Sequence, residues 1–205
     1  MNKNLLIRPL FAAILVAVLQ TAFLGYMIES RASILRNGVD VVLKTVPVDP
    51  RDLLRGDYVI LAYDISTIPG ERVKGKRPDT SGTHELWVRL EKTSTEYWDA
   101  AEASFEPLAP QADSVIVHGK IGYQALASLF DAAGALLNPE DTVTPLTNIE
   151  YGIERYYVPE GEGKVLEEAR NASALSVTAR VDDAGTMQIR LIAIDGKPLY
   201  EEPLY

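Results

Sequence analysis

The 205-residue sequence contains no cysteine and only two histidines. Without cysteine the chain forms no disulfide and offers no thiolate ligand to a metal, which leaves both a cytoplasmic and a periplasmic location open. The histidines, His84 and His118, lie on separate predicted strands, and neither belongs to a recognisable ligand pattern. We therefore expect no metal site and no cofactor.

The motifs of common enzyme classes are absent as well. The sequence has no glycine-rich phosphate loop, no GxSxG elbow and no HExxH helix. The segment Gly161-Glu162-Gly163 is too short to indicate a nucleotide site. We expect no recognisable catalytic apparatus and therefore assign no catalytic residue.

Basic residues are in the minority. The chain carries 20 lysines and arginines against 29 aspartates and glutamates, a net charge of −9. Only Lys3 and Arg8 are charged before Glu29, so the remainder carries 18 basic and 29 acidic residues, a net charge of −11. An acidic body without a basic stripe argues against nucleic acid as a partner.

One long segment has no charge at all. Residues 9–28 are twenty uncharged residues, of which only Gln20 and Thr21 are clearly polar. At 1.5 Å per residue this segment spans about 30 Å, the thickness of the hydrocarbon core of a bilayer. A cleaved signal peptide is the alternative, but its apolar region is about 7–15 residues long. We expect an uncleaved anchor that contacts membrane lipid through residues 9–28, within one helix from about Leu5 to Arg36.

Positive charge flanks both ends of this segment. Lys3 and Arg8 precede it, and Arg31, Arg36 and Lys44 follow it, so the positive-inside rule gives nearly a tie. A short basic tail before an apolar segment is the usual form of a signal anchor, which favours a domain outside the cytoplasm. We divide the chain into an anchor helix, residues 1–37, and a soluble β-rich domain, residues 38–205.

The soluble part has the pattern of a mainly β protein. Short alternating segments predict strands at residues 39–48, 58–65, 85–91, 95–100, 114–119, 150–158, 174–181 and 186–194. One short C-terminal helix is predicted from Glu162 to Asn171. Residues 124–137 are ambiguous, because alanine and leucine favour a helix while Asp131-Ala132-Ala133-Gly134 could equally form a hairpin turn; we favour a short helix or an irregular insertion, followed by a loop at residues 139–145. These elements predict an α+β fold in which an antiparallel sheet forms a barrel or a sandwich.

The segment Gly56-Asp57-Tyr58-Val59-Ile60-Leu61-Ala62-Tyr63 is the centre of this pattern. Glycine and aspartate favour a turn, and the residues that follow have high strand propensity. Apolar residues alternate along both faces, with Val59, Leu61, Tyr63 and Ile65 on one face and Tyr58, Ile60 and Ala62 on the other. A strand that is apolar on both faces predicts a central strand covered on both sides.

This octet matches every fixed position of the pattern that names the GDYXXLXY family. A second segment, Tyr151-Gly152-Ile153-Glu154-Arg155-Tyr156-Tyr157-Val158-Pro159-Glu160-Gly161-Glu162-Gly163, resembles the C-terminal signature of the same family. The resemblance implies a bacterial membrane-anchored protein and brings no established activity with it. Such proteins are commonly encoded beside, or fused to, polytopic membrane proteins, which implies an accessory domain with a membrane partner. We accordingly expect a single-pass protein of the bacterial inner membrane with a periplasmic C-terminal domain.

The two motif segments supply the candidate binding residues. They are Gly56, Asp57, Tyr58, Leu61, Tyr63, Gly152, Glu154, Tyr156, Pro159, Glu160, Gly161 and Gly163. Tyr151, Tyr156 and Tyr157 suit a contact surface, because tyrosine is favoured at interfaces, and they suit core packing equally well.

An alternative function uses the carboxylates. An envelope hydrolase or sugar-binding domain would bring Asp57 together with Glu154 or Glu160, about 5–10 Å apart, in one cleft. The segment from Leu53 to Val59 also resembles part of the signal-peptidase motif. Val48 occupies the position of the serine nucleophile, so that chemistry has no attacking atom.

Overall fold

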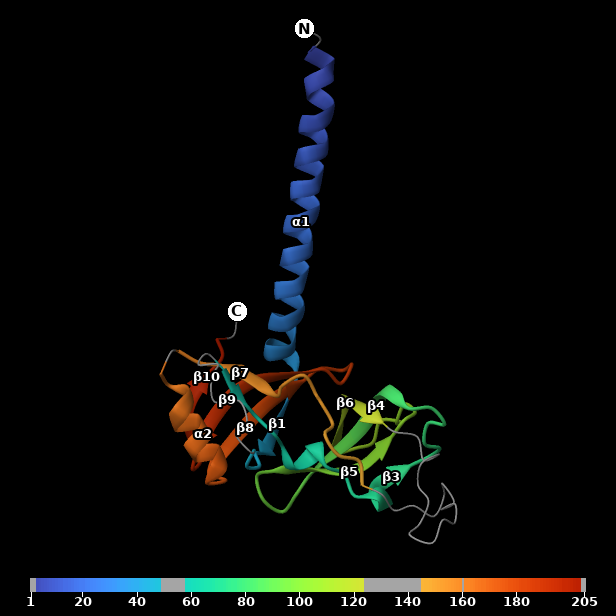
Figure 1. The fold of residues 1–205 in the computed structure, drawn as a ribbon, viewed down its shortest axis with the longest axis vertical. Coiled ribbons are helices and arrows are strands. Elements are labelled where there is room, and N and C mark those ends of the chain that lie inside the picture. The colour runs from blue at the N-terminus through green and yellow to red at the C-terminus, as the bar shows by residue number, and fades with distance from the viewer. Residues whose placement is uncertain (1–2, 49–57, 124–144, 160, 204–205) are drawn as a thin grey trace.

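A computed structural model describes residues 3–48, 58–123, 145–159 and 161–203. A single long helix, α1 (Lys3–Asn37), stands on a compact domain of strands (Figure 1). The predicted helix from Leu5 to Arg36 is confirmed. Its segment Phe11–Asn37 contains an 18-residue window with a mean hydropathy of 2.1 and is long and apolar enough to cross a membrane.

The described residues of the domain form two four-stranded sheets and a two-stranded ribbon. The first sheet has the order β1-β8-β9-β10, formed by Val39–Lys44, Leu175–Val181, Met187–Ile194 and Lys197–Glu201. The second sheet has the order β3-β5-β4-β6, formed by Val73–Lys74, Trp98–Ser104, Gly82–Lys92 and Ser114–Tyr123. The ribbon pairs β2 (Tyr58–Ile60) with β7 (Arg155–Tyr157). Short 3₁₀ turns cover Asp64–Ser66 and Gly70–Arg72, and helix α2 covers Gly163–Asn171.

The strands enclose one hydrophobic core. Leu86, Val88 and Leu90 of β4 are completely buried, as their alternation predicted, and Val177 of β8 faces the same cluster. All strand pairs are antiparallel except β3 with β5. The predicted α+β class and the short C-terminal helix are confirmed, and the sheets pack in a sandwich-like arrangement. Within the described residues they do not close into the barrel that was the other expectation.

The central strand differs from its prediction. The strand β2 covers three residues, and the chain then continues irregularly to an isolated bridge between Tyr63 and Thr45. The inward face is correct, since Val59, Leu61, Tyr63 and Ile65 are each at most 1% exposed. The expectation of cover on both sides was wrong, because Ile60 on the opposite face is 39% exposed. The segment lies in a two-stranded ribbon rather than in the middle of a large sheet.

Helix α1 joins the domain through a close-fitting junction. Ala32, Ile34 and Leu35 are buried where the helix ends on β8 and β9. The guanidinium of Arg180 donates hydrogen bonds to the carbonyls of Leu35 and Arg36, two of the last four residues of the helix, whose carbonyls have no partner within the helix. A side chain on Gly38 would lie 2.6 Å from the Ile34 carbonyl oxygen, so only glycine fits this close approach.

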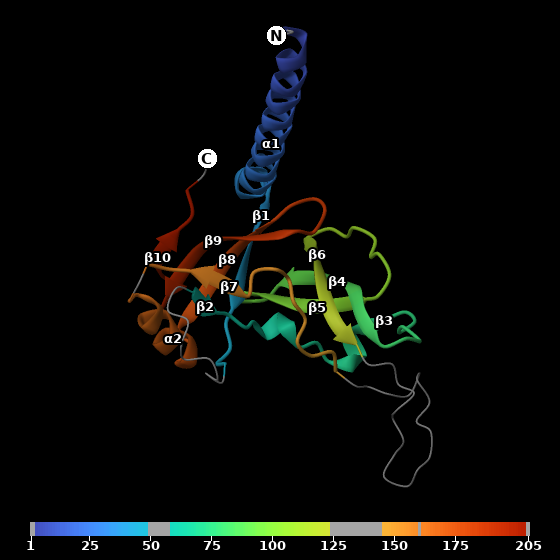
Figure 2. The same cartoon turned by 45° about the horizontal axis from the view of Figure 1, so that its top comes forward.

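A bridging carboxylate reinforces the junction. Asp40 on β1 accepts hydrogen bonds of 2.7 Å from both Arg180 and Arg190. Burial alone would raise the pKa of Asp40, but these two arginines outweigh it and lower the pKa. Asp40 thus holds Arg180, which in turn bonds to the end of α1. Only Gly38 separates the end of α1 from the start of β1 (Figure 2).

Candidate functional site

The ribbon brings the two motif segments together. Tyr58, Val59 and Ile60 pair with Tyr157, Tyr156 and Arg155 in antiparallel register. The pairing extends one step further, because the Leu61 N–H donates to the Glu154 carbonyl at 2.8 Å. Segments that are remote in the sequence therefore form one local unit.

Two buried tyrosines tie the segments together reciprocally. The Tyr63 hydroxyl donates to the Ile153 carbonyl at 2.6 Å, and the Tyr151 hydroxyl donates to the Ile65 carbonyl at 2.6 Å. Burial, followed by the negative charge of Glu154, raises the pKa of both hydroxyls, so they remain protonated donors at neutral pH. Both tyrosines hold the fold together and are not accessible to a ligand.

Glu154 holds the turn that precedes β7. Its carboxylate accepts hydrogen bonds from the backbone N–H of Tyr151 at 2.5 Å and from that of Gly152 at 2.9 Å. Gly152 has φ +84°, a conformation that favours glycine. The carboxylate is therefore used to stabilise this turn.

Helix α2 covers one side of the ribbon. Leu166 is completely buried, and the guanidinium of Arg170 donates to the Ile60 carbonyl at 2.5 Å. Burial lowers the pKa of Arg170, while Glu167 acts in the opposite direction. Pro159 and Gly161 precede this helix and Gly163 is its first residue, and the Glu162 N–H donates to the Pro159 carbonyl.

The opposite side of the ribbon is open. We call it the ribbon face and define it as Tyr58, Ile60, Arg155 and Tyr157, which share one face of the two strands. Tyr157 is 71% exposed. Its ring centroid lies 5.9 Å from that of Tyr58, and the Arg155 guanidinium lies 5.8 Å from the centroid of the Tyr58 ring. The arginine is therefore close enough for a cation–π interaction.

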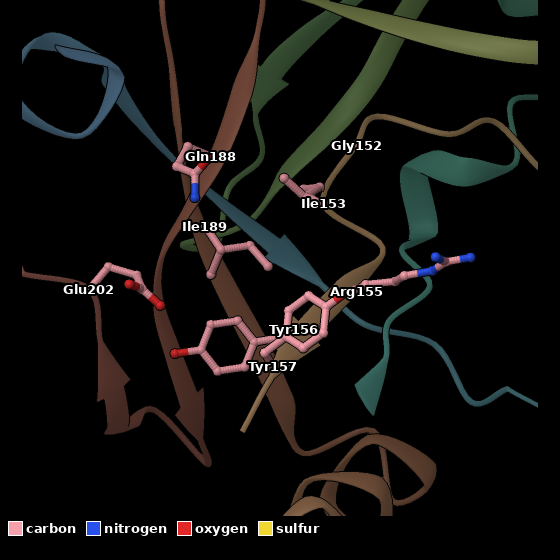
Figure 3. Close-up of a pocket in the computed structure, with 8 residues that line it drawn as sticks. All are labelled: Gly152, Ile153, Arg155, Tyr156, Tyr157, Gln188, Ile189 and Glu202. Atoms are coloured by element: carbon pink, nitrogen blue, oxygen red, sulfur yellow. The ribbon is translucent and has the colours of Figure 1, made fainter. Parts of the chain in front are cut away.

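A pocket of about 170 Å³ adjoins the ribbon face (Figure 3). It is lined by Gly152, Ile153, Arg155, Tyr156, Tyr157, Gln188, Ile189 and Glu202. Burial, followed by the charge of Glu202 and a hydrogen bond to its carboxylate, raises the pKa of Tyr156. Gln188 accepts a hydrogen bond of 3.0 Å from Arg31 of α1, so the pocket lies next to the base of the helix.

The structure brings together six of the twelve predicted residues. Tyr58, Leu61, Tyr63, Gly152, Glu154 and Tyr156 lie in or beside the ribbon, while Pro159, Gly161 and Gly163 follow it. Gly56, Asp57 and Glu160 lie outside the described residues. The predicted residue set did not include Arg155, Gln188 and Glu202. The alternation of Arg155 with Tyr156 could have revealed the first, but no local signal marks the other two.

Within the described residues, no group of three or more histidine and carboxylate side chains could hold a metal ion.

No curated protein and no solved structure matches the chain. A family model described as GDYXXLXY protein matches residues 20–191, which is most of the chain and includes both motif segments. The chain belongs to the GDYXXLXY family, and its N-terminal apolar helix fits a membrane-anchored member of that family.

Proposed function

We propose that this chain is a membrane-anchored, extracytoplasmic accessory domain that binds a polytopic membrane protein in the same bilayer. The observation that carries this proposal is the ribbon face, an open group of two tyrosines, an isoleucine and an arginine on an otherwise acidic domain. Tyrosine and arginine are enriched at protein interfaces, where they contribute much of the binding energy.

The position of the ribbon supports a partner that is itself in the membrane. The apolar segment ends near Ile28, and the first residue of α1 buried by the domain is Ala32. Four residues of helix span about 6 Å, so the domain begins within the headgroup layer. In Figure 1, β7 lies at the end of the domain from which α1 leaves.

The rigid junction adds to this argument. Because Ala32, Ile34 and Leu35 are buried and Arg180 binds the last helical carbonyls, the helix holds the domain at one height and in one orientation. A surface held in this way loses little further orientational freedom when it binds a partner in the same membrane. A flexible tether would suit a ligand in bulk solution instead.

The alternative, an envelope hydrolase or sugar-binding domain, has less support. Its candidate Glu154 is already bonded to two backbone N–H groups, which accounts for both carboxylate oxygens. Its other candidates, Asp57 and Glu160, lie outside the described residues, so their convergence stays a prediction.

Site-directed photo-crosslinking in the native membrane tests the proposal. A photo-reactive amino acid at Tyr157 of the full-length chain should give a product with a polytopic membrane protein, identified by mass spectrometry. The matched control position is Tyr97, a tyrosine that lies between β4 and β5, away from the ribbon. Arg155→Glu should reduce the Tyr157 product. Equal products at both positions, or none at Tyr157, would contradict the proposed surface.

The proposed orientation of the chain in the membrane has a separate test. Alkaline phosphatase is active only outside the cytoplasm, so its fusion to the C-terminus should be active. A cytoplasmic reporter that is active in the same position would reverse the proposed orientation.

A further inference from the structure

Gln20 is the feature of α1 that membrane insertion alone does not explain. It lies well inside the uncharged segment, residues 9–28, and is surrounded by exposed apolar side chains. Its neighbour Thr21 donates its hydroxyl to the Ala17 carbonyl at 2.9 Å and is therefore satisfied within its own helix. In the described part of the chain no such bond forms from the Gln20 amide. A carboxamide in hydrocarbon without a partner is unfavourable, so its presence indicates a partner in the membrane.

The helix places Gln20 on the side that meets the domain. Gln20 and Arg31 are eleven residues apart, which is about three turns at 3.6 residues per turn, so they lie on the same face. Arg31 bonds to Gln188, a residue of the pocket, and Ile34 on this side is buried. The opposite side carries Glu29, whose carboxylate pairs with Arg36.

The geometry points to the Gln20 face of α1 as the binding surface for a transmembrane helix of the partner. This inference rests on the proposed function and adds the location of its intramembrane contact. A helix packed there stands directly over the pocket and Gln188, so one partner contacts both α1 and the membrane end of the domain. Ala13 and Ala17 lie on the same face, about two turns and one turn from Gln20, and leave room for close approach.

A second copy of this chain does not fit the same face. In a parallel dimer each Gln20 face would meet the other, and each helix carries its domain beneath that face through Arg31 and Ile34. In Figure 1 the domain spreads to both sides of the base of α1, so two such helices in direct contact would force the two domains to overlap. The occupant is therefore a helix without such a domain below it, donating to and accepting from the Gln20 amide.

A pair of matched leucines tests the inference in the full-length chain. Leu24 is four residues from Gln20 and shares its face, whereas Leu15 is nine residues from Leu24, about two and a half turns, and lies on the opposite face. A photo-reactive amino acid at Leu24 should crosslink to a polytopic membrane protein, and one at Leu15 should not. Gln20→Leu should reduce the Leu24 product roughly threefold to thirtyfold, the effect of one interhelical hydrogen bond.

Three outcomes would overturn the inference. A Leu24 product containing only two copies of this chain would show a homodimer, equal yields at Leu24 and Leu15 would show a nonspecific contact, and no product at Leu24 would leave only lipid around the helix. A product at Tyr157 combined with none at Leu24 would refute this inference and leave the proposed function standing. No product at either position would refute both.

Discussion

The two faces of the β2/β7 ribbon have the same kinds of residues and different surroundings. On the inward face, Val59 is completely buried, and the inward-facing residues that follow it, Leu61 and Tyr63, are 1% exposed. On the outward face, Tyr157 is 71% exposed and Ile60 is 39% exposed. Tyr63 is thus a structural tie and Tyr157 an accessible surface, because they lie on opposite faces of this unit. Residues of the inward face hold the fold, and those of the outward face are exposed to solvent.

We expect the largest difference in the free energy of unfolding between variants of Tyr63 and variants of Tyr157. Tyr63→Ala removes a buried ring and its hydrogen bond to Ile153, and we expect it to lower the free energy of unfolding by roughly 3–5 kcal/mol. Tyr157→Ala should change it by less than about 0.5 kcal/mol, because the side chain is exposed. Urea denaturation of a soluble form that begins at Glu29 measures both. Similar losses in the two variants would remove the distinction between the faces.

The stability of the domain should also depend on the junction between the end of α1 and the first sheet. A chain that begins at Gly38 lacks Ala32, Ile34 and Leu35 and exposes the apolar surface that they cover on the first sheet. We expect it to be less stable by about 2–4 kcal/mol than the chain that begins at Glu29, allowing for the freedom the short helix regains. Denaturation midpoints of the two forms provide the measurement. Equal midpoints would show that the helix end adds nothing to the domain and that the orientation of α1 is not fixed.

Alkaline pH should lower the stability of the folded domain by a smaller amount, through the two buried tyrosines. The pKa values of Tyr63 and Tyr151 are raised in the folded domain, so their contribution to stability is complete below the unfolded pKa of about 10 and decreases above it. Each should cost about 1 kcal/mol between pH 10 and pH 11. Tyr63→Phe should make the dependence of stability on pH less steep in this range than it is in the wild type. An unchanged slope would argue against the buried tie.

Much of the fold was predictable because it depends on local alternation. Leu86, Val88 and Leu90 alternate with polar neighbours, and this period alone identifies β4 and its buried face. The strand β10 was not predicted, because Lys197–Glu201 is short, contains proline and gains its stability from pairing with β9 at the edge of the sheet.

The candidate site was predictable only in part. The alternation around Val59 predicted which side chains point inward, but whether anything covers the outward face depends on strands far away in the sequence. The same limit applies to the pocket, where Gln188 and Glu202 join Tyr156 through the long-range pairing of the first sheet. The reciprocal ties of Tyr63 and Tyr151 to the opposite segment also required the folded structure.

We propose that the ribbon face binds a membrane partner without holding the fold together. The decisive measurement takes one preparation of Tyr157→Ser beside the wild-type chain and determines both its free energy of unfolding and whether a polytopic membrane protein co-purifies with it in detergent. We expect an unfolding free energy within about 0.5 kcal/mol of wild type and a loss of most of the co-purified partner. A stable variant that retains a partner at the wild-type level would show that the ribbon face is not the binding surface.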